Sequence, residues 1–206
     1  MEKINYQKKT DEIVAHLENE GTRPSLLLQS CCGPCSSYVL EYLSRYFAVT
    51  VLYYNPNIYP KAEYDKRLGE QRRLIKEMRF SSTVGFMDCQ YDGERYFGAV
   101  RGLEDLPEGG GRCAVCFRLR LEETAKRAKD GGFDYFGTTL TVSPHKNADL
   151  INRLGIEIGE KYKVSFLPSD FKKRNGYKRS IELSKMLDLY RQDYCGCKFS
   201  LNKKEK

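Results

Sequence analysis

The feature that most constrains the fold is the alternation of short apolar stretches with longer amphipathic ones. Leu26–Leu28 is an apolar run, and the β-branched and aromatic stretch Val49–Tyr54 follows it along the chain. Such runs are typical of buried strands. Pro34, between them, suits the first turn of a helix. Strand, helix and strand in this order predict two parallel neighbours in one sheet.

The rest of the chain repeats this alternation. Further strands are expected over Thr83–Met87, Phe133–Thr139 and Val164–Leu167. Helices are expected from Pro34 onward and over Ala62–Met78, Glu94–Leu103, Phe117–Lys129, Lys146–Tyr162 and Arg179–Tyr190. The pattern predicts one α/β domain over residues 1–206, with a Rossmann-like parallel sheet covered by helices on both faces. Residues 1–22 are expected to add a helical extension to the sheet, and residues 199–206 to form a polar tail.

Length, composition and charge exclude several protein classes. The 206 residues are enough for one hydrophobic core. No run of 18 apolar residues is present, so no membrane span is expected. Met1–Glu20 is polar and charged, unlike a secretory signal, so a cytoplasmic location is expected. The net charge of +7 is compatible with a polyanionic partner.

Cysteine is the unusual component of the sequence. Seven of the eight cysteines fall into three tight groups: Cys31, Cys32 and Cys35; Cys113 and Cys116; and Cys195 and Cys197. In a reducing compartment this pattern indicates metal or redox chemistry. Cys89 stands alone, and we interpret it as a small buried hydrophobic residue. Seven thiols exceed the four of a structural zinc site, although two zinc ions are an alternative.

The adjacent pair Cys31 and Cys32 suggests two metals. Neighbouring side chains at a strand end point in opposite directions. The pair is therefore expected to address two different metals rather than to chelate one, and Cys35 could join either. The helix N-terminus that follows Gly33 favours thiolates, because its positive end stabilises anions. The spacing Cys113-x-x-Cys116 alone occurs in thioredoxin-like, zinc and iron–sulfur proteins.

Five segments together resemble one known family. The segments Leu26–Leu43, Tyr53–Pro60, Gly111–Ala125, Gly137–Asn147 and Tyr190–Ser200 look like the QueH family of epoxyqueuosine reductases, in the same order. The family is similar in layout to tRNA-modifying PP-loop enzymes of the HUP superfamily. The resemblance implies a [4Fe–4S] cluster beside a mononuclear iron. It also implies removal of the epoxide oxygen of epoxyqueuosine at the tRNA wobble position, without cobalamin and with an external electron donor.

Within the resemblance, the cysteines divide between the two metal groups. The cluster is expected on Cys32, Cys113, Cys116 and one member of the pair Cys195 and Cys197. The single iron is expected on Cys31, Cys35 and the other member, which makes Cys31, Cys35 and Cys197 the candidate catalytic residues. Some family members carry aspartate where Cys35 stands.

Other polar residues follow predicted strands or form a basic run. Candidates for substrate contact are Tyr53, Asn55, Asn57, Thr138, Thr139 and Lys146, which lie past strand ends on the cysteine edge of the sheet. Candidates for tRNA phosphate contact are Lys172, Lys173, Arg174, Lys178 and Arg179. For the first set, the competing interpretation is a loop with its own turn contacts. For the second set, it is a solvated basic face.

Two other functions compete with the reductase. An ATP-dependent PP-loop tRNA thiolase needs a glycine-rich pyrophosphate loop after the first strand. Here Cys31, Cys32 and Pro34 stand in that loop, so ATP binding should be lost. A zinc-stabilised RNA-binding module is the second alternative, but it does not need seven clustered thiols.

Overall fold

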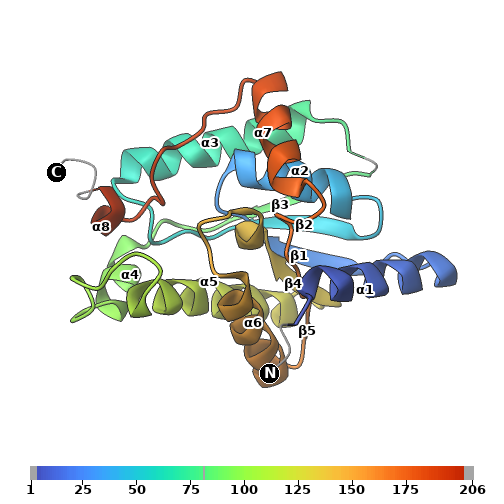
Figure 1. Cartoon of the computed structure of the whole chain (residues 1–206), viewed down its shortest axis with the longest axis horizontal. Helices are drawn as coiled ribbons and strands as arrows, with labels where there is room; N and C mark the ends of the chain where they lie inside the picture. The colour runs from blue at the N-terminus through green and yellow to red at the C-terminus, as the bar shows by residue number, and fades with distance from the viewer. Residues whose placement is uncertain (1–3, 81, 202–206) are drawn as a thin grey trace.

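The computed structural model describes residues 4–80 and 82–201, which form a five-stranded sheet with helices on both faces (Figure 1). The strands are β1 (Ser25–Gln29), β2 (Ala48–Tyr53), β3 (Gly85–Asp88), β4 (Tyr135–Thr138) and β5 (Ser165–Phe166), in the order β3-β2-β1-β4-β5. Every neighbouring pair is parallel. The predicted single Rossmann-like α/β domain is confirmed.

The helices follow the predicted alternation. They are α1 (Tyr6–Glu20), α2 (Gly33–Leu43), α3 (Lys61–Glu77), α4 (Gly93–Ala99), α5 (Gly111–Asp130), α6 (Ala148–Tyr162), α7 (Gly176–Met186) and α8 (Lys198–Leu201), with a 3₁₀ turn, η1 (Thr139–Val142). Among the described helices, none is long and apolar enough to cross a membrane.

Side-chain alternation along β1 divides the core into two layers. Leu26 and Leu28 pack on one side of the sheet, in a cluster with residues of α1, α2 and α3. Leu27 packs on the other side, with residues of α5 and α6. Because successive strand side chains point to opposite faces, one apolar run serves both layers. In the N-terminal segment, helix α1 buries Val14 and Leu17 in the first layer.

Three helices differ from the prediction by three or more residues at one end or at both. Helix α5 begins at Gly111 rather than Phe117, so Cys113 and Cys116 lie in its first two turns instead of in a loop. Helix α4 ends at Ala99, earlier than predicted. Helix α7 covers Gly176–Met186 instead of Arg179–Tyr190, because its amino end is set by Asn175 in the left-handed region.

The C-terminal end of the chain is not a simple polar tail. Residues 199–201 belong to α8, and the Arg112 guanidinium lies 4.7 Å from the centre of the Phe199 ring. Residues 202–206 lie outside the described residues.

Glycine permits the close approach of α6 to the edge strand β5. A Cβ atom at Gly155 would lie 2.4 Å from Cζ of Phe166, a contact that normal packing does not allow. The Phe166 ring packs in turn on Phe136, with ring centres 5.2 Å apart.

Replacement of Gly155 by Ala is therefore expected to destabilise the fold. Overpacking of this kind costs about 1–3 kcal/mol, although alanine favours helix. Gly69→Ala is the matched control, because that site is an exposed helix position with nothing within 4 Å of the new methyl group. The control should stabilise the protein by about 0.5–1 kcal/mol. Urea denaturation of the two variants measures both effects, and equal shifts would contradict the packing argument.

Candidate functional site

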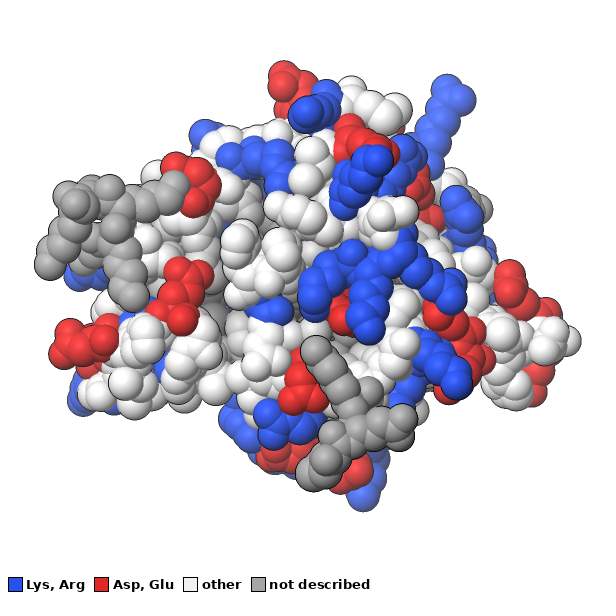
Figure 2. Space-filling model, viewed as in Figure 1, with Lys and Arg blue, Asp and Glu red and all other residues white. Residues whose placement is uncertain are grey.

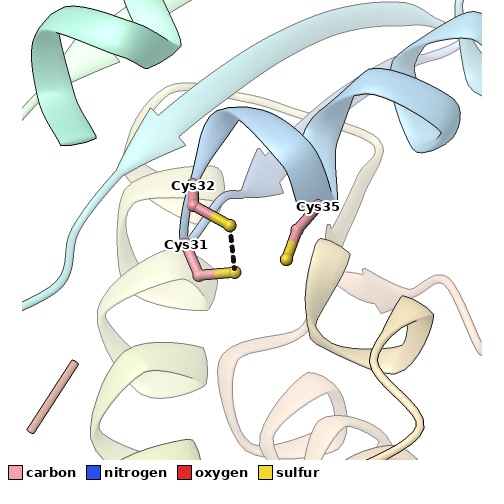
Figure 3. Close-up of side chains that lie close together, drawn as sticks. All are labelled: Cys31, Cys32 and Cys35. Carbon is pink, nitrogen blue, oxygen red and sulfur yellow. Dashed lines mark hydrogen bonds between the residues drawn. The ribbon is translucent and has the colours of Figure 1, made fainter. Parts of the chain in front are cut away.

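Three cysteine sulfurs converge where β1 ends and α2 begins (Figure 3). Cys31 lies in a bend after the strand, Cys32 is the N-cap residue of α2, and Cys35 lies in the first turn of that helix. The Sγ atoms of Cys31 and Cys32 are 3.7 Å apart, and all three sulfurs lie within 4.8 Å of one another. Among the described residues, this is the group of three or more possible ligands that could hold a metal ion.

The predicted divergence of Cys31 and Cys32 is wrong. That prediction assumed that both residues continue a strand, but β1 ends at Gln29 and the backbone bends before the helix. The bend turns the two sulfurs toward each other. With a metal–sulfur bond of about 2.3 Å, two thiolates on one tetrahedral ion lie about 3.8 Å apart. The separation of the two sulfurs in the structure therefore suits ligands of one metal and does not support their assignment to different metals.

The three thiols differ in how readily they ionise. Hydrogen bonds from Cys32 and then Cys35 hold the pKa of Cys31 well below its usual range, although burial opposes this. The hydrogen bond to Cys31 in turn raises the pKa of Cys32 to about 12, and the pKa of Cys35 is raised well above its usual value. Of the three thiols, Cys31 is therefore the one whose ionised form the surroundings favour. A bound cation would favour loss of the remaining protons.

The other clustered cysteines surround the same region from α5 and from the C-terminal end of the chain. Cys113 packs against the core cluster that contains Cys31 and Cys32. Cys116 and Cys197 are buried together in a small apolar cluster. Burial, with the nearby charges of Cys195 and Cys197, raises the pKa of Cys116 to about 12, while Arg120 acts in the opposite direction.

Two half-buried or buried cations lie among these thiols. Burial disfavours the charged form of Arg120, but interactions with Cys116, Cys31 and Cys195 outweigh it and raise the pKa of the guanidinium. The pKa of Lys146 is likewise raised by Cys195, Cys31 and Cys35, against the effect of burial. At least one cysteine from each of the three groups therefore interacts with one of these cations, and Cys31 and Cys195 interact with both.

Residues 187–197, here called the C-terminal strap, carry Cys195 and Cys197 past the outer face of α3 (Figure 1). Two guanidinium N–H groups of Arg73 donate to the carbonyl oxygens of Leu187 and Asp188, at 3.0 and 2.9 Å. The carboxylate of Glu70 accepts the backbone N–H of Tyr190 at 2.9 Å and also pairs with Arg73. One face of α3 thus holds the start of the strap.

The far end of the strap is held by close packing around Gly196. This residue has φ +111°, and a Cβ atom there would lie 2.9 Å from Nη1 of Arg67. Its carbonyl oxygen accepts the N–H of Tyr59 at 2.8 Å. The glycine between Cys195 and Cys197 is therefore required both by the backbone conformation and by the buried guanidinium.

A cavity of about 590 Å³ opens beside the cysteines. Its wall includes Cys31, Cys35 and Cys195 and several polar side chains. Four wall residues have a buried polar atom without a hydrogen-bond partner among the described residues: Asn57 Oδ1, Arg67 Nη2, Arg120 Nε and Gln192 Oε1. Unsatisfied buried polar groups are costly, so the wall is suited to a ligand that carries both donors and acceptors.

The structure separates the predicted substrate residues into two sets. Asn55, Asn57 and Lys146 line the cavity. Tyr53 does not line it, because its ring is fully buried and its hydroxyl group donates to the Tyr64 carbonyl oxygen. Thr138 and Thr139 are also buried beneath the cavity rather than in its wall; Oγ1 of Thr138 donates to Gln29, and that of Thr139 lies 3.8 Å from Cys31 Sγ.

The cavity residues Arg67, Arg120 and Gln192 were not identified from the sequence. Each lies in a segment with many charged residues. In such a segment the sequence does not distinguish a buried cation or amide from the exposed ones around it. The sequence signal for Arg67 was its position on α3 in line with Glu63, Glu70 and Arg73, which share one helix face at spacings of three and four.

The basic run proposed for tRNA contact lies at the start of α7, near the amino end of α1. Figure 2 shows Lys and Arg side chains gathered in this part of the face. Most members of the run also have acidic partners: Lys172 pairs with Asp170, Arg174 with Asp11 and Arg179 with Glu41. Lys173 approaches Asp170 at 3.9 Å, whereas Lys178 is exposed. The run is therefore less positive than its composition suggests.

Comparison with known proteins identifies a single group of relatives. A family model described as Epoxyqueuosine reductase QueH matches residues 26–203. The Epoxyqueuosine reductase QueH of Streptococcus pyogenes serotype M1 is 46% identical over 201 residues, which cover 97% of this chain and 79% of the relative. Its counterpart in Staphylococcus epidermidis is 44% identical, over 98% of this chain and 87% of the relative. That of Thermotoga maritima is 37% identical, over 86% and 90%.

Removal of the Glu70 carboxylate is expected to loosen the strap. Glu70→Ala leaves the Tyr190 N–H without its acceptor, which should lower the free energy of unfolding by about 1–3 kcal/mol and increase hydrogen exchange in residues 188–197. Glu77→Ala is the control, because Glu77 also pairs with Arg73 but is exposed. That exposed pair should be worth less than about 1 kcal/mol. Equal exchange in both variants would show that Glu70 does not anchor the strap.

Proposed function

Because the chain belongs to the epoxyqueuosine reductase QueH family, we propose that it reduces epoxyqueuosine at the wobble position of tRNA to queuosine. The reaction consumes two electrons and two protons: both carbon–oxygen bonds of the epoxide break, the two carbons form a double bond, and the oxygen leaves as water. The observation that carries the proposal is the group of three convergent thiols, two of which, Cys31 and Cys35, lie in the wall of a polar cavity. An external donor must supply the electrons.

The cysteines fit an iron-containing cofactor in number, type and spacing. Thiolates are soft ligands that suit iron–sulfur clusters, and the 3.7 Å separation of two sulfurs suits ligands of one metal. We propose that a [4Fe–4S] cluster and an adjacent iron are held by the seven clustered cysteines. Cys31, Cys32 and Cys35 form one set of ligands, and Cys113, Cys116, Cys195 and Cys197 supply the others. When bound, these groups would provide electrons and a Lewis acid for the epoxide oxygen.

The remaining cavity residues bind and orient the substrate. The unpartnered Asn57 Oδ1 and Arg67 Nη2 offer an acceptor and a donor for a base turned out of the anticodon. Lys146 extends into the cavity wall near Cys31 and Cys35. Its ammonium group is placed to donate a hydrogen bond to the oxygen as negative charge develops there, the usual role of a fixed donor in such a site. Asn55 orients Arg120, since its Oδ1 accepts from the guanidinium at 2.7 Å.

Loss of any one of Cys31, Cys32 or Cys35 is expected to abolish both metal binding and turnover. Each Cys→Ala change removes one ligand of the same group, so bound iron should fall in all three variants. Single-turnover conversion of tRNA containing epoxyqueuosine should fall about a hundredfold or more, because a lost Lewis acid is worth several kcal/mol. Iron and acid-labile sulfide are measured in the same samples. Cys89→Ser is the control, because Cys89 lies outside the convergent group and the cavity wall.

Other outcomes of that experiment distinguish the competing functions. Zinc without sulfide in the wild-type protein, and no conversion, would support a zinc-stabilised RNA-binding module. A requirement for ATP would support a thiolase. Conversion by the reductase should need a strong reductant and be indifferent to ATP and cobalamin.

We further propose that tRNA phosphates contact the basic run Lys172, Lys173, Arg174, Lys178 and Arg179. This run adjoins the cavity because α7, which begins within it, packs on α2, the helix that carries Cys35. Tyr177 and Ser180, from the same segment, are themselves part of the cavity wall. With a tRNA bound on this surface, one of its nucleotides would therefore be able to enter the cavity.

Charge removal at Lys178 and Lys173 is expected to weaken tRNA binding without affecting the metal. Removal of each ion pair with a phosphate should reduce the slope of log K against log salt by about one unit or slightly less. The double variant Lys173→Ala with Lys178→Ala is compared with Lys129→Ala, an exposed lysine at the opposite end of the sheet on α5. Affinities measured at several salt concentrations test the surface. An unchanged slope in the double variant would mean that the run is only a solvated face.

A further inference from the structure

Gln192 links the C-terminal strap to the convergent cysteines. Its Nε2 lies 3.1 Å from Sγ of Cys32, although the two residues are 160 positions apart in the sequence. Its other amide atom, Oε1, is buried and has no hydrogen-bond partner among the described residues. The sulfur is therefore the group that fixes the orientation of this amide.

The direction of the hydrogen bond follows from the chemistry of the sulfur. A cysteine that binds metal has lost its proton, so its sulfur can only accept. The amide must then turn its N–H toward Cys32 and Oε1 away from it. Arg67 adds positive charge near the same sulfur, since the charge of Cys32 contributes to the raised pKa of that guanidinium. Gln192 differs from Arg67 in that it makes a directed contact with the sulfur.

The position of Gln192 does not depend on the metal. Two residues before it, the Tyr190 N–H is held by Glu70, and the Tyr190 hydroxyl group lies 3.1 Å from both carboxylate oxygens of Glu63. Two residues after it, the Tyr194 hydroxyl group donates to the Tyr59 carbonyl oxygen at 2.8 Å. The amide is thus presented to the cysteines by a segment anchored on both sides.

We infer that Gln192 is a positioning residue that donates an N–H···S hydrogen bond to the metal-bound sulfur of Cys32. The inference rests on the cofactor in the proposed function. Hydrogen bonds from the protein to metal ligands fix ligand orientation and set affinity and potential. Here the bond holds one ligand in place and withdraws electron density from its sulfur.

Cobalt(II) tests this role without iron, sulfide or tRNA. Metal-free full-length protein is titrated with Co²⁺, and the thiolate-to-cobalt absorption is recorded for wild type, Gln192→Leu and Gln192→Met. Both changes remove the N–H donor while leaving side chains of different shape. We expect Co²⁺ affinity to fall by about 10–100-fold, as for other residues that support metal ligands. The absorption band should also move to lower energy, because a sulfur without its hydrogen bond gives up electrons more easily.

Matched measurements separate this role from a general effect on folding. Gln90→Leu is the control, since Gln90 is an exposed glutamine outside the strap and the cavity wall; its affinity and band should match wild type. Thermal unfolding of each metal-free variant reports any loss of structure, and a change in the band energy is not produced by destabilisation alone. Equal affinity and equal band energy in wild type and the Gln192 variants would overturn the inference and leave the reductase proposal intact. A wild-type protein with no thiolate–cobalt band would overturn the inference and the proposed cofactor together.

Discussion

The site depends on the contact between α3 and the C-terminal strap. The hydrogen bonds from Arg73 and to Glu70 hold the start of the strap on α3, and contacts with Tyr59 hold its far end, so the last cysteines of the chain lie near the first. The strap has no regular backbone hydrogen bonding of its own, so side chains of a neighbouring helix must supply it. The charged face of α3 is therefore a structural part of the site, although it touches neither the convergent thiols nor, except at Arg67, the cavity wall.

The parallel sheet brings the remaining site residues together, because the carboxyl ends of all its strands lie at one edge. Residues after β1 give the convergent thiols, residues after β2 give Asn55 and Asn57, and the turn after β4 leads to Lys146. Buried cations are expensive unless opposite charges accompany them. Arg120 and Lys146 are tolerated here because cysteine sulfurs lie near both cations, and the thiolate form of Cys31 is favoured in turn by their charges. The cations in the cavity wall thus favour ionisation of the cysteines, and the cysteine sulfurs in turn favour the charged form of the cations.

The sequence was sufficient for features that depend on local periodicity, and insufficient for those that depend on a remote partner. The apolar run Leu26–Leu28 predicted its strand, because burial on both faces leaves a continuous hydrophobic signal. Cysteine spacing predicted the candidate metal ligands. The convergence of Cys31 and Cys32 was missed, because one bend after Gln29 replaces strand alternation. Arg67 and Gln192 were missed as well, since their importance comes from the strap and the cavity, and neither is visible within a local window.

Ionisation of the convergent thiols ties metal binding to the stability of the strap. In the metal-free protein the pKa of Cys31 is lowered and that of Cys35 is raised, because each of these thiols interacts with the other members of the group. A bound cation removes the remaining protons, so its affinity rises with pH and its binding free energy adds to that of folding. Cys195 lies among the same charges as Cys31, so a ligand there would hold the strap from the cavity side while α3 holds it from outside. With Cys195 as a ligand of the proposed cofactor, metal binding would add to the anchoring of the strap that α3 already provides.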